Sequence, residues 1–319
     1  MSINKKLSLF FTLVTLIFSS GCVPKNPLPL ESNYTSSNIN VPYISPRSEL
    51  CASTSIEMVS SYWQSIISYE PHLTLKELDK RTLIPSKGGT LQIELISAAR
   101  ANGFIVYPLE PTFDALLSEL LAYHPVIVLV NRSYSWYPLW HYAPITGYDS
   151  KTETILTHFA DKPNEAVSIG TFAALWQRSE NWGVVLLPPG ELPATASAKK
   201  FLHATYDLEK MGMMDEAIMS YKSALVRWPE DTDILFALGN AYYSSNQISN
   251  AEEIYRRILS IDFTYSLAIN NLADLLCHTD RPAEALKLIN MAVTDDLEID
   301  SIIQSTRKEI SRGCIYTRP

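Results

Sequence analysis

The sequence predicts an α+β domain followed by an all-α domain. Residues 41–190 alternate between helical and strand patterns of apolar residues, whereas residues 198–312 show helical patterns only. The Pro-rich stretch PPGELPATAS, residues 188–197, separates the two parts, and we place the linker over residues 191–197 within it. Hydrophobic residues make up 46% of the chain and charged residues 19%, which is typical of a chain with a packed core.

The length and charge of the chain limit the class of protein. At 319 residues it is long enough for two domains. Its formal net charge of -8 argues against nucleic acid as a partner, because nucleic-acid binding needs clustered lysine and arginine.

The first 21 residues have the pattern of an export signal. Two lysines precede an apolar stretch over residues 7–18, which is too short to span a bilayer as a mature helix. Small residues occupy positions 19–21, and the cysteine directly after them, Cys22, resembles the lipidation site of bacterial lipoproteins. This resemblance implies that residues 1–21 are removed and that Cys22 carries lipid, palmitate included. The alternative is an ordinary secretory signal that ends at a cysteine.

A tether follows the signal. Residues 22–40 are rich in Pro, Ser and Asn and have no apolar periodicity, which is typical of a flexible connection between a lipid and a domain. Val23 stands where lipoproteins of another destination carry Asp, which implies the outer membrane, facing the periplasm. Ser19 departs from the lipoprotein motif, which usually has Leu there.

The cysteines outside the signal are odd in number. Without Cys22 three remain, Cys51, Cys277 and Cys314, so at least one thiol is free or pairs outside the chain. Cys277 lies among apolar residues of a predicted helix and is most simply a small buried hydrophobe. A disulfide between Cys277 and Cys314 is the alternative, and the sequence does not set the distance between them.

Cys51 stands at the start of a predicted helix. Ser48 is a good N-cap, and Ile56, Val59 and Trp63 form an apolar stripe at helical spacing. The helix is therefore expected to run into the core, with Cys51 in its first turn. Free backbone N–H groups and the positive end of the helix dipole favour a thiolate there. This suits a nucleophile, although any polar residue can occupy such a position.

The segments that follow complete the α+β domain. Thr74 and Glu77 have the spacing of a capping box. The Gly88-Gly89 turn is not a phosphate loop, because no Gly-Lys-Ser/Thr follows at the required spacing. We expect helices over residues 74–81, 90–102, 112–123 and 171–179, and strands over residues 104–109, 125–131, 141–149, 154–159 and 182–188.

His141 begins a strand at the end of an aromatic loop. The loop RSYSWYPLW, residues 132–140, follows the strand that ends at Asn131. A cysteine at a helix start and a histidine on a later sheet suit a nucleophilic thiol, because the imidazole takes the thiol proton and then protonates the leaving amine. Asn131 and Trp140 are candidates to hold an oxyanion or line a cleft. The run from Tyr134 to Trp140 either lines a cleft or packs in the core.

Several stretches together resemble one family. They are VPYI, GGTLQIELISAAR, PVIVLVN, PLWHYAPITGYD and WGVVLLPPGELPA. The pattern is similar to that of bacterial outer-membrane lipoproteins that have a bacteriocin-processing-type, papain-like cysteine peptidase domain followed by tetratricopeptide repeats. The resemblance implies a papain-like fold over residues 41–190, with Cys51 as nucleophile and His141 as general base. It also implies cleavage near small residues such as Gly-Gly.

The chain departs from this family at three places. Pro46 stands where the family has a glutamine that helps to hold the oxyanion, and Ala52-Ser53-Thr54 replaces Gly-Pro-Ala. Pro144 removes a ladder donor from the strand after the histidine, which fits only an edge or a bulge. Loss of one oxyanion donor costs about 100- to 1,000-fold in rate without changing the fold. A degenerate module that binds peptides is therefore the alternative to an active peptidase.

The third member of a catalytic triad is less well defined. The wider fold places Asp or Asn on the strand after the histidine strand, and Asp161 is the nearest carboxylate, with Thr157 and His158 as polar neighbours. Asp149 is expected to cap the hairpin turn. We expect no metal or other cofactor, because the histidines outside this region have no metal-ligand spacing. They are His72, His124, His203 and His278.

The second part contains a repeat of 34 residues. Ala217, Ala251 and Ala285 recur at this period, and a large residue follows each by four positions. The pattern resembles tetratricopeptide repeats, three copies over residues 198–299, with a capping helix over residues 300–312. Such repeats bind partner peptides in a concave groove, which we favour over a purely structural annex.

The expected function is that of a lipid-anchored cell-envelope cysteine peptidase. It would hydrolyse peptide bonds of a peptide or protein substrate through a Cys51 thioester, while the repeats recruit a protein partner. A catalytically degenerate scaffold lipoprotein is the second hypothesis. Amide transfer or cell-wall amidase activity through the same thiol is the third.

Overall fold

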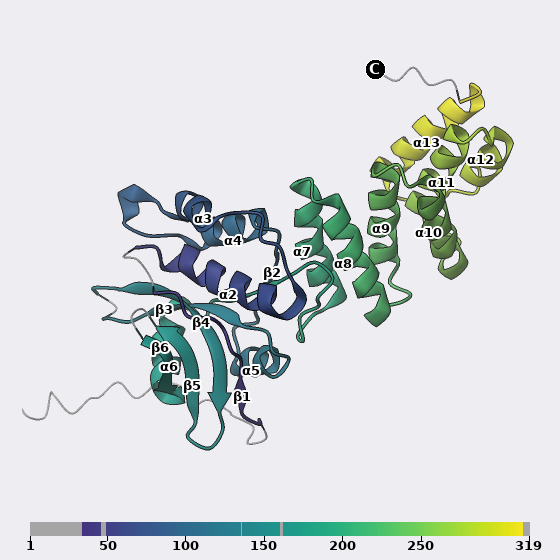
Figure 1. Ribbon diagram of the computed structural model, residues 1–319. Coiled ribbons are helices and arrows are strands. Elements are labelled where there is room, and N and C mark those ends of the chain that lie inside the picture. Colours follow the sequence, from purple (N-terminus) through teal and green to yellow (C-terminus); the bar gives the residue numbers. More distant parts are fainter. Residues whose placement is uncertain (1–33, 46–48, 135, 160–161, 315–319) are drawn as a thin grey trace, which may run out of the picture. The chain divides into compact units, whose positions relative to one another are not determined.

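The computed structural model describes residues 34–45, 49–134, 136–159 and 162–314 (Figure 1). Several features predicted from the sequence lie outside these residues: the export signal, Cys22, Pro46, Ser48 and Asp161. None of the helices within the described ranges has the length and apolar character needed to cross a membrane.

The first part of the chain is an α+β domain built on one antiparallel sheet, which confirms the predicted fold class. Its strands lie in the order β2-β7-β3-β4-β5-β6, and β1 pairs with β4. The strands are β1 (Ser37–Asn38), β2 (Ile105–Pro108), β3 (Val126–Asn131), β4 (Trp140–Asp149), β5 (Thr154–Phe159), β6 (Lys162–Ser168) and β7 (Gly183–Leu187). The helices are α2 (Cys51–Ile67), α3 (Leu75–Thr82), α4 (Gln92–Ala101), α5 (Phe113–Leu121) and α6 (Ile169–Trp176).

Helix α2 packs against β4 and forms the core of this domain. The predicted stripe, Ile56, Val59 and Trp63, is buried, and Trp63 Nε1 donates to the Leu186 carbonyl oxygen at 2.9 Å. Helices α3 and α4 gather beside α2, away from the sheet (Figure 1). The predicted capping box at the start of α3 is present, with both bonds between Thr74 and the residue three positions later.

Several boundaries differ from the sequence prediction, and the tether predicted to extend to residue 40 ends earlier, because β1 (Ser37–Asn38) pairs with β4. Helix α4 begins at Gln92, two residues later than expected, after a short 3₁₀ turn over Pro85–Lys87. Strand β6 was not predicted, because its sequence KPNEAVS is polar and contains a proline. It lies at the edge of the sheet, where such residues are tolerated.

The expectation for Pro144 is met only in part. Pro144 pairs with Ile127 inside β4, a strand with neighbours on both sides rather than an edge strand. A register shift follows between Ile145 and Gly147. The Thr157 hydroxyl donates to the Pro144 carbonyl oxygen at 2.9 Å, so a side chain supplies a bond where the ladder is irregular.

Two carboxylates form hydrogen bonds at a hairpin turn and at the linker that follows the domain. Asp149 Oδ1 accepts from the Lys151 N–H at 2.9 Å, which confirms its expected place at the hairpin turn. The Glu119 carboxylate of α5 is fully buried and accepts from His124 Nδ1 at 2.7 Å, the Thr195 N–H at 2.8 Å and the Ala194 N–H at 3.1 Å. It therefore fixes the linker to α5.

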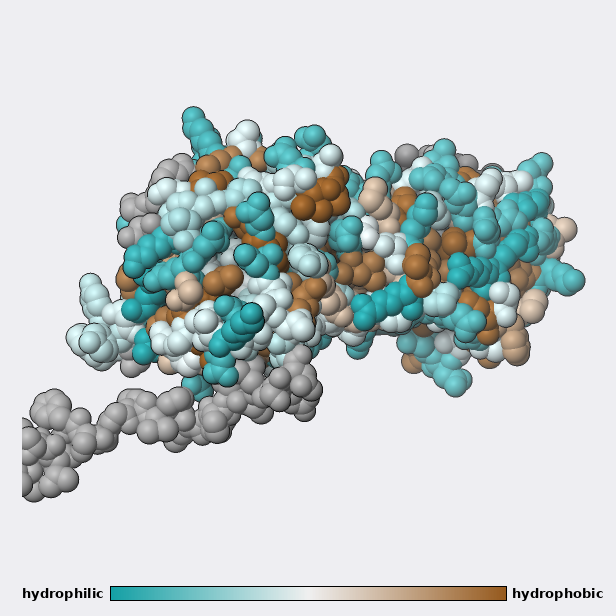
Figure 2. Space-filling model, turned by 60° about the horizontal axis from the view of Figure 1, so that its bottom comes forward, coloured by the Kyte–Doolittle hydropathy of each residue, from teal (hydrophilic) through white to brown (hydrophobic). Residues whose placement is uncertain are grey.

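The second part consists of helices packed in consecutive pairs, as the repeat predicts (Figure 1). The recurring residues Ala217, Ala251 and Ala285 are fully buried, and so is each large residue four positions later. The helices are α7 (Ala198–Lys210), α8 (Met214–Arg227), α9 (Thr232–Ser244), α10 (Ile248–Ile261), α11 (Ser266–His278), α12 (Pro282–Ile289) and α13 (Leu297–Ser311). On the face seen in Figure 2, apolar side chains form separate patches among hydrophilic ones.

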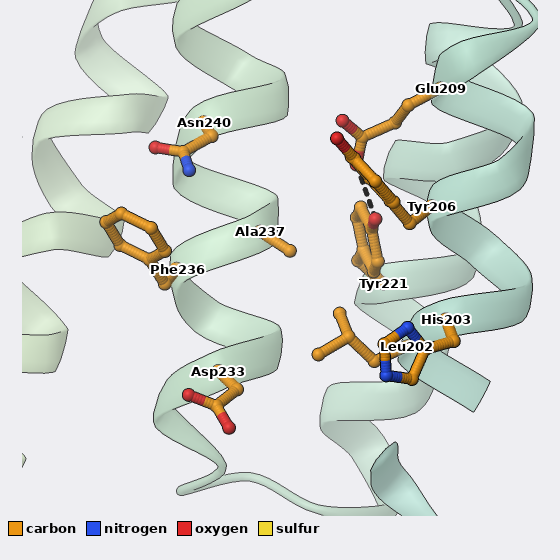
Figure 3. Close-up of a pocket in the computed structure, with 9 residues that line it drawn as sticks. All are labelled: Leu202, His203, Tyr206, Glu209, Tyr221, Asp233, Phe236, Ala237 and Asn240. Carbon is orange, nitrogen blue, oxygen red and sulfur yellow. Dashed lines mark hydrogen bonds between the residues drawn. The ribbon is translucent and has the colours of Figure 1, made fainter. Parts of the chain in front are cut away.

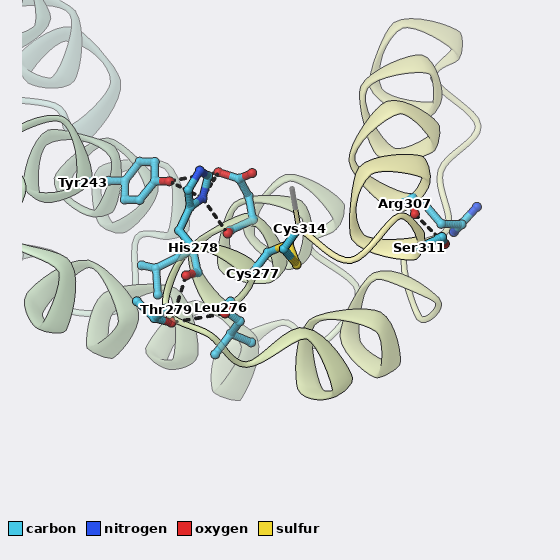
Figure 4. The surroundings of a disulfide bond; sticks show 10 residues. Tyr243, Leu276, Cys277, His278, Thr279, Arg307, Ser311 and Cys314 are labelled. Carbon is cyan, nitrogen blue, oxygen red and sulfur yellow. Dashed lines mark hydrogen bonds and ion pairs between the residues drawn. A yellow bond between two sulfur atoms is a disulfide. The ribbon is translucent and has the colours of Figure 1, made fainter. Parts of the chain in front are cut away.

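A disulfide joins Cys277 of α11 to Cys314, just after α13 (Figure 4). Their Cα atoms are 5.5 Å apart, within the range of disulfides. The expected burial of Cys277 is confirmed, and the disulfide that the sequence left open as an alternative is present. Helix α13 packs back on α11 and brings the two cysteines together, which a linear sequence does not reveal.

Candidate active site

Cys51 is the first residue of α2 and the one free cysteine of the described residues. Cys51 lies in the first turn, as predicted, but the prediction of Ser48 as the N-cap is wrong: Leu50 occupies that position, with no side-chain capping bond. The thiol sulfur accepts backbone hydrogen bonds from the N–H groups of Tyr142, Cys51 and Ala52. Tyr142 directly follows His141 on β4, so α2 brings the thiol to the strand segment that carries the histidine.

A second contact fixes this approach of α2 to β4. One turn along the helix from Cys51, the buried Ser55 hydroxyl donates to the Tyr142 carbonyl oxygen at 3.2 Å. The same residue of β4 is thus bonded at its N–H by Cys51 and at its carbonyl by Ser55. A helix start is held at a defined point of the sheet, as a cysteine–histidine pair requires.

The electrostatics of the thiol differ from the sequence expectation. Burial raises the pKa of Cys51, and the three backbone N–H groups lower it by less. The helix start does favour the thiolate, as expected, but desolvation of the charged sulfur outweighs it. Cys51 is therefore a neutral thiol in the resting protein at neutral pH.

His141 has the complementary property. Burial, and to a lesser extent the Arg132 guanidinium, lowers the pKa of His141 to about 4. Phe159 of β5 lies edge-on to the imidazole, with ring centroids 6.3 Å apart, and Arg132 lies 5.2 Å from the centroid of the Phe159 ring. The imidazole is therefore neutral at pH 7, which is the protonation state that a general base needs.

Asn131 and Trp140 face each other across β3 and β4. Asn131 is buried, and its Oδ1 accepts from the N–H groups of Ser133 and Leu139, each at 3.0 Å. Arg178 donates to the carbonyl oxygens of Asn131 and Ser133. Asn131 thus holds both ends of the aromatic loop, so its amide oxygen is occupied by the protein itself.

The aromatic loop is exposed rather than packed in the core. Trp136 is 80% exposed and Tyr137 is 69% exposed, and Tyr134 stacks on Trp136 with ring centroids 5.7 Å apart. Trp140 lines a hollow of about 380 Å³. The other residues that line it are Thr90, Leu91, Gln92, Leu129, Tyr142, Arg178, Ser179 and Glu180.

Of the three candidates for a third catalytic residue, the structure describes His158 and Thr157. Asp161 lies outside the described residues. The neighbouring His158 is buried and structural: its Nε2 bonds the Val41 carbonyl oxygen at 2.8 Å and its Nδ1 accepts from the Asn164 N–H at 3.1 Å. Thr157 is bonded to Pro144. In the described ranges no group of three or more His, Cys, Asp or Glu side chains could hold a metal ion.

Sequence reasoning missed Tyr142 and the residues of the hollow. The Tyr142 contribution is its backbone N–H, which every residue except proline has, so no residue type signals it. The hollow gathers residues from α4, β3, β4 and the 3₁₀ turn Gln177–Ser179, far apart in the sequence. The Thr90 hydroxyl there is buried and has no hydrogen-bond partner among the described residues.

Two family models match separate parts of the chain. Residues 38–183 match the model of the Peptidase_C39 like family, and residues 208–268 match a tetratricopeptide repeat model. The search of curated proteins gave no match.

Solved structures similar to this chain include helical-repeat proteins. One is the type III secretion chaperone SycD of Yersinia enterocolitica in complex with a peptide of the translocator YopD, with 16% identity over 36% of this chain and 92% of that chain and a TM-score of 0.34. Another is the first TPR of Spaghetti (RPAP3) bound to an HSP90 peptide, with 18% identity over 35% and 88% and a TM-score of 0.32. The TPR2B domain of yeast Sti1 matches with 18% identity over 34% and 90% and a TM-score of 0.31.

Proposed function

We propose that this chain, which has a Peptidase_C39-like domain and tetratricopeptide repeats, is a cysteine peptidase of the cell envelope, with Cys51 as nucleophile and His141 as general base. One observation carries the proposal: the Cys51 sulfur accepts a hydrogen bond from the backbone N–H directly after His141. This supports the proposal, because it brings the thiol to the residue next to His141 in β4; the transfer of a proton between the two side chains is part of the proposal.

The chemistry follows from two neutral groups. As the Cys51 sulfur attacks the peptide carbonyl carbon, the thiol proton moves to the His141 imidazole, and a tetrahedral oxyanion forms. The imidazolium then gives this proton to the leaving amine, and a thioester forms at Cys51. Water, deprotonated by His141, attacks the thioester carbonyl; the carboxylic acid product leaves and the thiol is regenerated. The raised pKa of the thiol and the lowered pKa of the imidazole mean that the proton moves during the attack rather than before it.

The oxyanion needs donors other than a glutamine side chain at position 46, which is proline in this chain. The N–H groups of Cys51 and Ala52 at the start of α2 have no intrahelical acceptor and bond the thiol sulfur in the resting protein; in this proposal they bond the oxyanion when it forms. The hollow beside Trp140 is our candidate for a substrate side chain. The unpartnered hydroxyl of Thr90 gives it a polar group that a substrate can bond.

The location in the envelope rests on sequence and on the disulfide. We propose that residues 1–21 direct export, that Cys22 is lipidated and that the protein faces the periplasm from the outer membrane. The Cys277–Cys314 disulfide supports export, because disulfides persist in oxidising compartments such as the periplasm. The repeats support recruitment of a protein partner.

The second candidate is a peptidase-like module that holds peptides without cutting them. The burial that raises the pKa of Cys51 favours it, as do the substitutions after Cys51 and at position 46. In this function the same hollow binds peptide, and the thiol has no chemical role.

Covalent labelling separates the two functions. The full chain is incubated with a peptidyl acyloxymethyl ketone, and the modified residue is identified by mass spectrometry, with Cys51→Ala as the control. The peptidase predicts one adduct, at Cys51, and its loss in the variant. An intact chain that never forms the adduct, yet still retains bound peptide, would establish the second candidate instead.

A further inference from the structure

A pocket in the second part of the chain has a chemistry that neither the repeat pattern nor the peptidase function assigns. It lies between α7 and α9, with α8 behind it, and has a volume of about 280 Å³ (Figure 3). Nine residues line it: Leu202, His203, Tyr206, Glu209, Tyr221, Asp233, Phe236, Ala237 and Asn240.

The wall of this pocket is apolar and aromatic. Leu202 of α7 and Phe236 of α9 are among the lining residues, and Tyr206 on α7 is 47% exposed. The ring of Tyr221 is fully buried behind them. Such a wall can pack along the methylene chain or the side chains of an extended peptide.

Carboxylates occupy both ends of the pocket. In Figure 3, Glu209 and Asn240 lie on opposite walls at one end of the pocket, and Asp233 and His203 lie on opposite walls at the other end. The Glu209 carboxylate accepts from the Tyr221 hydroxyl, and the exposed Asp233 carboxylate accepts from the Tyr265 hydroxyl at 3.2 Å. Both partners of the carboxylates are thus neutral phenols.

The negative charge of Glu209 is not offset by a cation. Burial raises the pKa of Glu209, and only the bond from the Tyr221 hydroxyl acts in the opposite direction. None of the nine lining residues is lysine or arginine. The nearest lysine on α7, Lys210, lies over the Tyr206 ring, 4.5 Å from its centroid, and pairs with Asp207 at 3.7 Å.

We propose that this pocket binds a lysine or arginine side chain of an extended segment of the partner protein, flanked by apolar residues. The proposal rests on the partner-binding role of the repeats given above and adds the chemistry of the partner. A cation beside Glu209 or Asp233 supplies the charge that the pocket lacks, and the aromatic wall packs against its methylene chain. A peptide that ends in acidic residues is expected to be repelled.

Three blocked octapeptides test this proposal on the full chain. They are acetylated and amidated, alternate leucine and serine, and differ at one central position, which is arginine, norleucine or glutamate. Cys51→Ala is present in every sample to prevent cleavage, and affinity is measured by fluorescence anisotropy. We expect the arginine peptide to bind at least about tenfold more tightly than either of the others.

Variants test whether the two carboxylates of the pocket cause the preference for arginine. Glu209→Gln combined with Asp233→Asn keeps the hydrogen-bond acceptors for the two tyrosines, and is expected to reduce the preference for arginine to less than about threefold. Glu253→Gln on α10, an exposed residue outside the pocket, is the matched control and should leave the preference unchanged. Circular dichroism verifies that each variant is folded.

The results separate failure of the charge preference from failure of the partner-binding role of the repeats. Equal binding of all three peptides would overturn the charge preference while the repeats still bind peptide. Tighter binding of the glutamate peptide would also overturn it. Absence of binding by every peptide at millimolar concentration would overturn both this inference and the partner-binding role on which it rests, but not the peptidase activity, which is read from Cys51 labelling.

Discussion

Removal of the Cys277–Cys314 disulfide is expected to destabilise the end of the repeats. The two cysteines are separated by 37 positions, and closing a loop of that length removes about 13 cal/mol/K of entropy from the unfolded chain, or about 4 kcal/mol at 25 °C. Helix α13 retains its buried contacts through Ile303 and Ile310, so the repeats still fold without the bond.

Urea unfolding followed by far-UV circular dichroism measures this effect. The Cys277→Ala/Cys314→Ala variant and the wild type in a phosphine reductant should both unfold at lower urea, by about 2 M if the slope is about 2 kcal/mol/M. Cys51→Ala keeps the disulfide and serves as the control, with the midpoint of the repeats unchanged. A reductant effect below about 0.3 M would refute the chain-entropy reasoning.

Three other properties can be tested. Gly239→Ala would place a Cβ 2.6 Å from Cε1 of the buried Tyr255 ring; we expect a net loss of about 1–2 kcal/mol in unfolding free energy, since overpacking exceeds the gain in helix propensity. Because burial raises the pKa of the Cys51 thiol above that of an ordinary cysteine, alkylation of the native chain by iodoacetamide should still rise above about pH 8.5. Glu119→Gln should lower the free energy of unfolding by about 2–4 kcal/mol at pH 7. The pKa of Glu119 is lowered in the folded state, so its carboxylate stabilises the fold above the unfolded pKa of 4.5, and this stabilisation is lost as the pH falls through the folded pKa. The difference in stability between the variant and the wild type should therefore vanish in acid.

Each of these tests has a contradicting result and a control. Unchanged denaturation of Gly239→Ala would mean that the Tyr255 ring moves aside. A plateau of alkylation near about pH 6 would reveal a preformed thiolate and contradict the neutral resting thiol. For Glu119→Gln, an effect that persists below the folded pKa would indicate lost packing rather than lost charge, and Glu298→Gln at an exposed site is the matched control.

The sequence predicted best those elements whose apolar or small residues recur at a fixed spacing. The stripe from Ile56 to Trp63 repeats at helical spacing, and the alanines from Ala217 to Ala285 repeat at 34 residues, so α2 and the repeat helices were predictable. Strand β6 has no such signal, because an exposed edge strand carries few apolar residues. Its pairing with β5 decides its structure.

The positions of Cys51 and His141 in their elements could be predicted from the sequence, but their electrostatics could not. Cys51 at a helix start and His141 at a strand start could be read from local patterns, whereas the burial that raises one pKa and lowers the other depends on segments distant in sequence. Glu119 shows the same limit: it lies within an amphipathic pattern, and only the returning linker explains a buried carboxylate there. The disulfide likewise depends on how α13 packs on α11.

The rate of Cys51 modification by the peptidyl ketone in the wild type and in His141→Ala tests the central claim most directly. The account predicts that the adduct forms at least about 100-fold more slowly in the variant at pH 7, because the thiol is neutral and needs the imidazole as proton acceptor. Equal rates in the two proteins, with both folded, would contradict the assignment of His141 as the base.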